Sequence, residues 1–427
     1  MALAALRAWW ADLSGPFAYR TFTVVWLTSL AANVGYTVQG VGASWAMASM
    51  APTPTMVALV QTAASVPIAL FALLSGVAAD AWDRRAVMLA SQALVFAVAA
   101  ALTGFSAAGY LAPAMILACT FLNGCGAALF QPTWQSSVAE QVPRSQLSAA
   151  IALDSFSLNF ARAAGPAFGG LIVARFTPGA AFLISALAGA VMIAALLSWK
   201  RPPPRRHPRE KLLAALAGGV AYCWRARRMR DALFRSALFG FLGSPVWALL
   251  PLFAKQQFGG AAGTYGMLLA AFGVGATAGA LGGAALRARH AKETVVRGGA
   301  FAFGLGIIAA AVSPALPGTL LGLSVAGASW VASVSTFNLS IQTGAPDRLA
   351  GRALSLFHSC IIGGMSLGSF AWGCVAEPLG VGAALLMSGL LMSASCLLGW
   401  LLPLAEADEP DAVLAVSGAG GMDGHCK

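Results

Sequence analysis

The sequence predicts an all-α membrane protein with twelve transmembrane helices in two pseudo-symmetric six-helix bundles. Three observations support this prediction. Of the 427 residues, 59% are hydrophobic and 10% are charged, which is too apolar for an ordinary water-facing surface. Long apolar stretches follow one another along the whole chain. Features of the first six stretches return in the second six at a constant spacing.

Each stretch is long enough for a bilayer, because a hydrocarbon core of about 30 Å needs about 20 apolar residues in a helix. The first half holds the stretches near residues 21 to 49, 55 to 79, 86 to 106, 110 to 137, 147 to 174 and 180 to 199. The second half holds those near 236 to 258, 263 to 286, 295 to 313, 316 to 343, 353 to 376 and 381 to 403. The expected units are an N-terminal half (1–199), a basic linker (200–235), a C-terminal half (236–403) and a tail (404–427).

The net charge of +11 fits membrane topology better than nucleic-acid binding, because the basic residues lie between apolar stretches. Positive charge stays in cytoplasmic loops. Besides most of the basic 200 to 235 stretch, the loops on that side hold Arg7, Arg20, Arg84, Arg85, Arg144, Arg287, Arg289, Lys292, Arg297, Arg348, Arg352 and Lys427. Near the outer ends lie only Arg175 and Lys255. We expect a multi-pass protein of a bacterial inner (plasma) membrane with both termini in the cytoplasm and no cleaved signal peptide.

The segment KRPPPRRHPREK, residues 200 to 211, combines prolines with dense positive charge, which favours an extended, solvated linker. The next residues mix a short apolar face with arginines and form either a helix on the anionic inner leaflet or a plain basic loop. The acidic, Gly-rich tail is expected to be a disordered cytoplasmic segment.

An internal repeat relates the two halves. A shift of 203 residues places Gly76 on Gly279, Arg84 on Arg287, Thr133 on Thr336, Ser137 on Ser340, Gly165 on Gly368, Gly170 on Gly373 and Ser185 on Ser388. Because six spans is an even number, both copies enter the membrane from the same side and form a parallel repeat. Transporters built this way place their substrate between the halves near the midplane.

The loop after the second span reads GVAADAWDRR and resembles the G-x-x-x-D-x-x-x-R-R signature of the major facilitator superfamily. Asp83 at the position of the second Gly resembles the transmembrane secretion effector branch, which includes enterobactin-exporter-like and macrolide-efflux-like proteins. The resemblance implies the major facilitator fold over residues 15 to 403. It also implies a cytoplasmic gating loop between the halves, formed by Gly76, Asp80, Asp83, Arg84, Arg85 and Arg352. Asp80 can accept hydrogen bonds at a helix N-terminus; the alternative is a set of simple stop-transfer charges.

The fifth span contains NFARAAGPAFGG, which resembles the antiporter motif of the same superfamily. Its residues here are Arg162, Gly165, Pro166, Gly169 and Gly170. Small residues allow close helix approach, and proline removes a backbone hydrogen bond and bends the span. Ordinary small-residue packing is the alternative.

Three ionisable residues in the spans are candidates for proton coupling: Asp154, Arg162 and His358. A charge at the middle of a span is costly unless it faces a wet or paired environment, so Arg162 should face a cavity or helix interface. Asp154 lies about 12 Å along the same helix and about 80° around it, which argues against a direct bridge but leaves a relay open. Asp154 can instead be a headgroup-region carboxylate, and His358 a hydrogen-bonded helix-end residue.

Uncharged polar and aromatic side chains in the spans are candidates for an amphipathic, weakly charged cavity, because they gain nothing by facing lipid tails. They are Asn33, Tyr36, Gln39, Gln61, Asn123, Gln131, Gln135, Asn159, Trp330, Asn338 and Gln342.

These features predict a secondary active exporter of small amphipathic or apolar molecules, of the drug or siderophore class, driven by proton antiport. Nucleotide-binding loops and H-E-x-x-H motifs are missing from the sequence, which argues against ATP-driven transport and a membrane hydrolase. We expect a monomer that is not an enzyme, has no cofactor or metal, and binds a small-molecule substrate, protons and lipid but no nucleic acid. The alternatives are an importer or uniporter of the same fold, a lipid flippase, and a membrane assembly factor.

Overall fold

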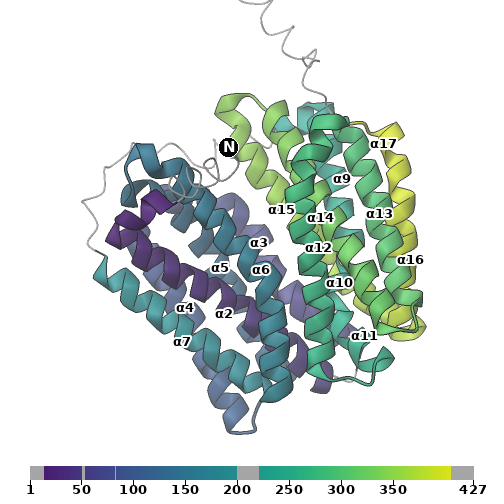
Figure 1. Ribbon diagram of the computed structural model, residues 1–427, viewed down its shortest axis with the longest axis horizontal. Helices are drawn as coiled ribbons and strands as arrows, with labels where there is room; N and C mark the ends of the chain where they lie inside the picture. The colour runs from purple at the N-terminus through teal and green to yellow at the C-terminus, as the bar shows by residue number, and fades with distance from the viewer. Residues whose placement is uncertain (1–13, 51–52, 82, 200–220, 405–427) are drawn as a thin grey trace, which may run out of the picture.

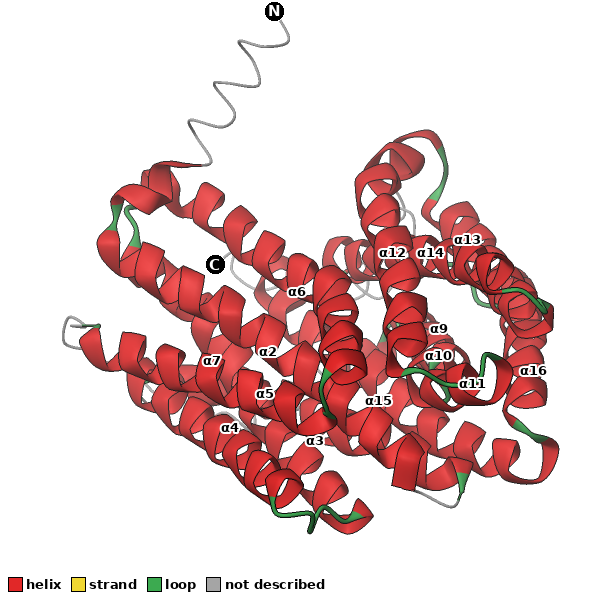
Figure 2. Cartoon of the chain, turned by 60° about the horizontal axis from the view of Figure 1, so that its bottom comes forward, coloured by secondary structure: helices red, strands yellow, loops and turns green. Residues whose placement is uncertain are grey.

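The computed structural model describes residues 14–50, 53–81, 83–199 and 221–404, except for the side chains of 72–81 and 347–348. Within these residues all regular structure is helical (Figure 2), which confirms the fold class that the sequence predicts. The KRPPPRRHPREK segment and nearly all of the tail lie outside the described residues.

The first half of the chain forms six long helices. They are α2 (Arg20–Met50), α3 (Pro54–Ala81), α4 (Arg84–Ala107), α5 (Pro113–Gln141), α6 (Leu147–Arg175) and α7 (Pro178–Ser198), with 3-10 turns at η1 (Gly15–Ala18) and η2 (Arg144–Gln146). Three of these helices begin at a proline, namely Pro54, Pro113 and Pro178. Proline lacks the N–H that a first helical turn leaves unpaired, so it suits these starts.

The second half repeats this arrangement with more interruptions. Its elements are α9 (Arg227–Gly243), α10 (Pro245–Ala248), α11 (Leu250–Gln257), α12 (Ala262–Arg289), α13 (Lys292–Val312), α14 (Leu316–Gly344), α15 (Asp347–Leu379), α16 (Val381–Ala394), η3 (Ser395–Leu397) and α17 (Leu398–Leu401). The span expected from 236 begins earlier, at Arg227, and bends by 42° before α11. Pro245 and Pro251 explain the bend, since each removes a backbone donor. The span expected from 353 begins at Asp347.

Helix contacts follow the same pattern in both halves (Figure 1). In the first half α5 packs on α3 and α4, α7 packs on α2 and α4, and α6 packs on α2. The corresponding pairs of the second half, α14 with α12 and α13, α16 with α13 and α9, and α15 with α9, are also in contact. Gly124 and Gly327, which the 203-residue shift relates, each lie against a backbone carbonyl of the neighbouring helix, that of Ala64 and that of Phe272. The parallel repeat is therefore visible in the packing.

Nine described helical segments are long and apolar enough to cross a membrane, or ten if the bent pair from α9 to α11 is one span. The helices α2 and α6, with 31 and 29 residues, have the length but are not among these nine. They carry polar candidates such as Asn33, Gln39, Asp154 and Arg162, which lower their apolar character. The membrane fold is confirmed, whereas composition alone does not establish all twelve spans.

Candidate functional site

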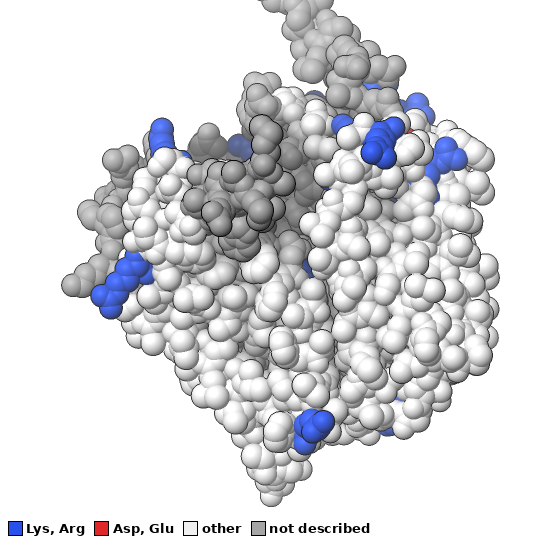
Figure 3. Space-filling model, in the orientation of Figure 1, with Lys and Arg blue, Asp and Glu red and all other residues white. Residues whose placement is uncertain are grey.

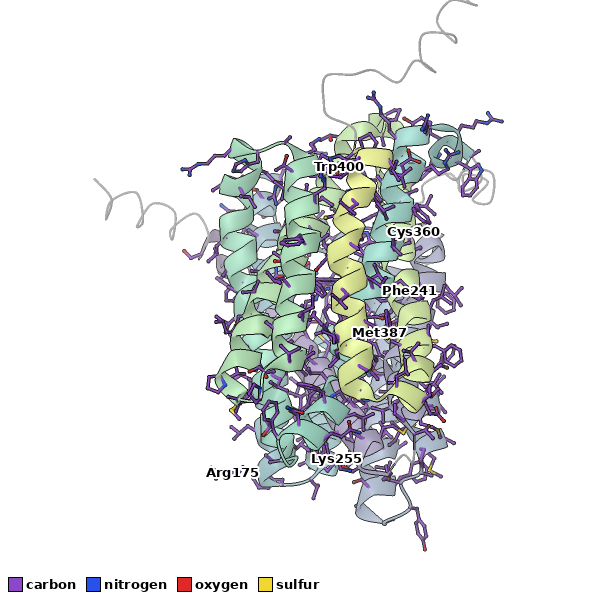
Figure 4. The ribbon with its side chains drawn as sticks, turned by 90° about the vertical axis from the view of Figure 1, so that its right-hand side faces the viewer. Arg175, Phe241, Lys255, Cys360, Met387 and Trp400 are labelled. Atoms are coloured by element: carbon purple, nitrogen blue, oxygen red, sulfur yellow. The ribbon has the colours of Figure 1, made fainter. Side chains whose placement is uncertain are left out.

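Basic side chains mark the two edges of the molecule. Figure 3 shows Lys and Arg along the upper edge, on the left-hand side at mid-height and, in smaller number, at the lower edge, with a broad uncharged face between them. Figure 4 places Trp400 near the upper edge, and Arg175 and Lys255 near the lower edge. Helix α6 ends at Arg175 on the lower edge, so it begins at the upper edge, as α4 does. Helix α12 follows Lys255 on the lower edge, so it ends at the upper edge. We call the upper edge the basic edge and the lower one the far edge.

The α6–α12 pair joins the two halves on the far-edge side. Gly170 of α6 lies directly against Gly266 of α12, so a side chain on either would overlap the other helix. Nearer the middle, the backbone of Ala163 lies against Gly273. The Gly170–Gly266 contact uses the outer parts of both helices, since α6 ends and α12 begins at the far edge.

The α3–α15 pair forms a second seam between the halves. Thr55 Oγ1 donates to Glu377 Oε2 at 2.5 Å, and Thr62 Oγ1 donates to the carbonyl oxygen of Ser366 at 3.1 Å. In addition, Lys255 Nζ donates to the carbonyl oxygen of Ala48 at 3.0 Å. Thr55 and Glu377 lie near the far-edge ends of their helices, so the two halves are tied together there.

Side chains that line the space between the halves are exposed on the basic-edge side of these seams. Arg162 and His358 are exposed although each lies well inside its helix. Arg162 also lies within electrostatic range of His358 of the opposite half, so the two side chains are near each other. The halves are therefore in contact on the far-edge side, whereas Arg162 and His358 are exposed on the basic-edge side.

Tyr36 of α2 is held beside Arg162 by the packing of α2 on α6. Thr37 Oγ1 donates to the carbonyl oxygen of Ala161 at 3.2 Å, and Asn33 Nδ2 donates to Ser157 Oγ at 3.3 Å. These bonds bracket Tyr36 and bring it within electrostatic reach of Arg162. The structure thus brings together Tyr36, Arg162 and His358, from α2, α6 and α15.

His358 has a defined orientation in this group. Its Nδ1 lies 2.9 Å from the carbonyl oxygen of Leu354. Because a carbonyl only accepts, Nδ1 carries the proton and Nε2 is left for other partners. The His358 ring is exposed, and its Nε2 atom is not used in the bond to Leu354.

The antiporter-like motif packs on helices of both halves. Gly165 and Gly169 face α2, where a Cβ on Gly169 would lie 2.9 Å from that of Val41. Gly170 faces α12 of the other half, and the carbonyl oxygen of Pro166 would lie 3.3 Å from a Cβ on Gly266. The small residues let α6 touch α2 and α12 at the same time.

Three residues of the predicted gating loop, Asp83, Arg84 and Arg85, make contacts within the first half. Asp83 caps α4 by accepting from the Ala86 N–H at 2.9 Å. Arg84 binds the carbonyl oxygen of Ser136 and the carboxylate of Glu140, both at 2.9 Å. Arg85 binds two carbonyl oxygens at the end of α7.

Gly76 and Asp80 lie in the part of α3 whose side chains are outside the described residues. Arg352 is half-buried in the second turn of α15. The role of this loop as a gate between the halves remains a prediction.

Asp154 lies apart from Arg162, inside the first half. It is 5% exposed, and its carboxylate accepts the indole N–H of the fully buried Trp134 at 2.5 Å. A buried carboxylate needs such a donor. The structure does not bring Asp154 to Tyr36, Arg162 or His358.

The other cavity candidates have mixed surroundings. Gln39 and Asn123 are buried, Asn159 donates to the carbonyl oxygen of Ser155 at 2.8 Å, and Gln61 donates to Ser65 at 2.9 Å. The remaining side chains are exposed at Gln135 and Gln342 and half-buried at Gln131, Trp330 and Asn338. Trp330 belongs to an aromatic cluster within the second half, with its ring 4.7 Å from that of Trp247 and 5.1 Å from that of Phe239.

Two ionic features were missed by sequence reasoning. The first is the Thr55–Glu377 contact, whose only sequence signal is a carboxylate at the end of a span beside Pro378. The second is Arg235, which is 5% exposed and binds both oxygens of Glu293 at 2.7 and 3.0 Å. Arg235 was assigned to the linker, but it lies within α9.

Comparison with known proteins agrees with this architecture. Among solved structures, the nucleoside transporter NupG superposes with a TM-score of 0.72, at 12% identity over 88% of this chain and 98% of that chain. A D-xylose-proton symporter superposes with a TM-score of 0.71, at 14% identity over 91% of this chain and 99% of that chain. At this identity the likeness concerns the fold.

Sequence relatives narrow the family. The multidrug efflux pump Tap of Mycobacterium tuberculosis is 26% identical over 91% of this chain and 94% of its own length. The uncharacterized MFS-type transporter YfiS of Bacillus subtilis is 23% identical over 80% and 82%. Residues 11–417 match the family described as transmembrane secretion effector. The chain therefore belongs to the transmembrane secretion effector family, within the major facilitator superfamily of membrane transporters.

Proposed function

We propose that the protein is a secondary active exporter of small amphipathic molecules that exchanges its cargo for protons across a bacterial inner membrane. The observation that carries the proposal is the group formed by half-buried Tyr36 with Arg162 and His358, which are exposed on the basic-edge side of the closed seams. If the basic edge faces the cytoplasm, as its charge favours, this arrangement is the loading state of an exporter.

Alternating access then follows from the two seams. Opening them at Gly170–Gly266 and Thr55–Glu377, while the halves close around Arg162, turns the site toward the far edge. The efflux activity named for the Tap relatives supports the outward direction. Family membership and the motif around Pro166 support exchange with protons.

Transport into proteoliposomes tests the proposal. Inside-out oriented protein should concentrate N-phenyl-1-naphthylamine or 1-anilinonaphthalene-8-sulfonate in the lumen only when the lumen is acidic. A protonophore should collapse the accumulation. Equilibration of the probe that is independent of the pH gradient would indicate a uniporter. Proton-driven accumulation that occurs only in right-side-out vesicles would indicate an importer. Movement of a fluorescent phospholipid between leaflets without either dye would indicate a flippase.

A further inference from the structure

The strongest unassigned feature of the molecule is the surroundings of Arg162. The described carboxylates are engaged elsewhere. Asp83 caps α4, Glu140 binds Arg84, Asp154 binds Trp134, Asp231 lies beside Arg227 and Arg230, Glu293 binds Arg235, and Glu377 binds Thr55. None of these described carboxylates forms an ion pair with Arg162. Its neighbours in charge are Tyr36 and His358.

An arginine in this position has a clear requirement. Guanidinium in a membrane-spanning region needs water or a counter-charge, and here water reaches it because the side chain is exposed between the halves. A bound molecule that fills this space displaces that water. A neutral molecule leaves the charge desolvated without a partner, and a cationic one adds repulsion, whereas an anionic group restores the lost interactions.

The three side chains suit recognition of an anion. Guanidinium offers paired N–H donors that match the two oxygens of a carboxylate or sulfonate. The Tyr36 hydroxyl can donate a further hydrogen bond from the same half. His358 belongs to the opposite half, and its Nε2 atom, which the Leu354 bond leaves unused, can donate to an anion when protonated.

We infer that this site selects amphipathic molecules that carry a carboxylate, sulfonate or similar negative group, which Arg162 binds with Tyr36 while His358 contacts it from the other half. The inference rests on the proposed transport function and adds the charge class of the cargo. A molecule held by residues of both halves also draws them together around the site, which is the movement that export requires.

A matched pair of probes tests the inference directly. 1-Anilinonaphthalene-8-sulfonate and N-phenyl-1-naphthylamine share one ring system, and only the first bears a sulfonate. Binding is measured by fluorescence with the full-length protein in nanodiscs, with empty nanodiscs subtracted. We expect wild-type protein to prefer the sulfonate. Arg162→Gln should weaken sulfonate binding about tenfold or more, the loss for a charged hydrogen-bonded contact. Binding of the neutral probe should not weaken, because the variant removes a charge that this probe leaves desolvated.

Three further variants separate recognition from folding. Arg162→Lys should retain part of the sulfonate preference, because it keeps the charge but loses the paired donors. Tyr36→Phe should weaken the sulfonate alone. Arg175→Gln is the matched control, since it removes an exposed arginine from the far-edge end of the same helix. Thermal unfolding of each variant in the same nanodiscs reports stability.

The outcomes distinguish the inference from the proposed function. Equal binding of the two probes by wild-type protein, or equal weakening of both by Arg162→Gln in a folded protein, overturns the anion site. Proton-driven export of the neutral probe with no export of the sulfonate also overturns it and leaves the exporter intact. Arg162-dependent sulfonate binding without proton-driven export supports the anion site and removes the proposed exchange.

Discussion

Asp154 and Arg162 belong to one helix but have opposite surroundings. Asp154 is held by the indole N–H of Trp134 in the interior of the first half, whereas Arg162 is exposed between the halves. A carboxylate with a fixed buried donor is restrained in position, and an exposed guanidinium can exchange water for a ligand. Any coupling between the two must therefore pass through the helix or through water.

Substitution at Asp154 separates its charge from its hydrogen bond. Asp154→Asn keeps an oxygen acceptor for Trp134 but cannot exchange a proton. If Asp154 couples, this variant should lose uphill export driven by a pH gradient in proteoliposomes while probe binding in nanodiscs stays within about twofold, because the site around Arg162 is untouched.

Trp134→Phe is the complementary change, since it removes the donor and keeps the carboxylate. It should lower the free energy of unfolding by about 1–3 kcal/mol and keep gradient-driven export. An Asp154→Asn protein that pumps uphill at the wild-type rate would assign Asp154 a structural role only.

The residues of the site differ in how far the sequence could predict them. Arg162 could be singled out because a charge inside an apolar span is costly. Tyr36 and His358 were named for separate roles, and only tertiary packing shows that they share one space with Arg162. Glu377 was missed because its partner Thr55 is 322 residues away along the chain, and no local pattern encodes that contact.

Helices α2 and α6 contribute Tyr36 and Arg162 to the site, and their mixed polar and apolar composition reflects this role. Both have spanning length but too many polar residues to pass as purely apolar spans. A helix with one face on lipid or other helices and another on a wet space needs this mixture.

The bend from α9 to α11 could be placed only with the structure, because prolines such as Pro67 and Pro166 lie inside continuous helices elsewhere.

The close contact of α6 with α12 predicts how a larger side chain would affect the far-edge seam. The Cβ of Gly170→Ala would lie closer to the Cα of Gly266 than van der Waals contact allows. Overlap of this kind costs about 1–3 kcal/mol, which shifts the balance about 5- to 150-fold away from the closed seam. Gly40→Ala is the matched control, since a Cβ at that position of α2 meets nothing within 4 Å.

The measurement uses a cysteine introduced at Ala163, which lies against Gly273 in the closed seam, in a background with native cysteines replaced. A membrane-impermeant maleimide added at the far edge should label this cysteine faster in Gly170→Ala than in Gly40→Ala. Equal rates in the two variants would show that the seam does not control access from that side.

At the level of the whole molecule, the repeat explains why the fold could be predicted so fully. A shift of 203 residues superimposes spans, and the same shift relates helix contacts such as those of Gly124 and Gly327. The relative tilt of the halves could not be predicted in this way. Alternating-access proteins have two arrangements of similar free energy, and which contacts are formed in one arrangement is not a property of either repeat alone.

The position of Arg162 has an electrical consequence. Its charge has no described carboxylate partner, so the rocking of the halves that we propose would move net charge through part of the membrane field. One elementary charge crossing the entire field changes free energy by about 2.3 kcal/mol per 100 mV, and Arg162 experiences a fraction of that.

Fast voltage steps on protein-containing planar bilayers should therefore record a transient displacement current in the absence of cargo. Arg162→Gln should abolish that current, and Arg175→Gln should preserve it. An anionic cargo that neutralises Arg162 should reduce it, which would make the loaded carrier nearly insensitive to voltage. Identical currents in wild type and Arg162→Gln would show that this charge does not move along the membrane normal.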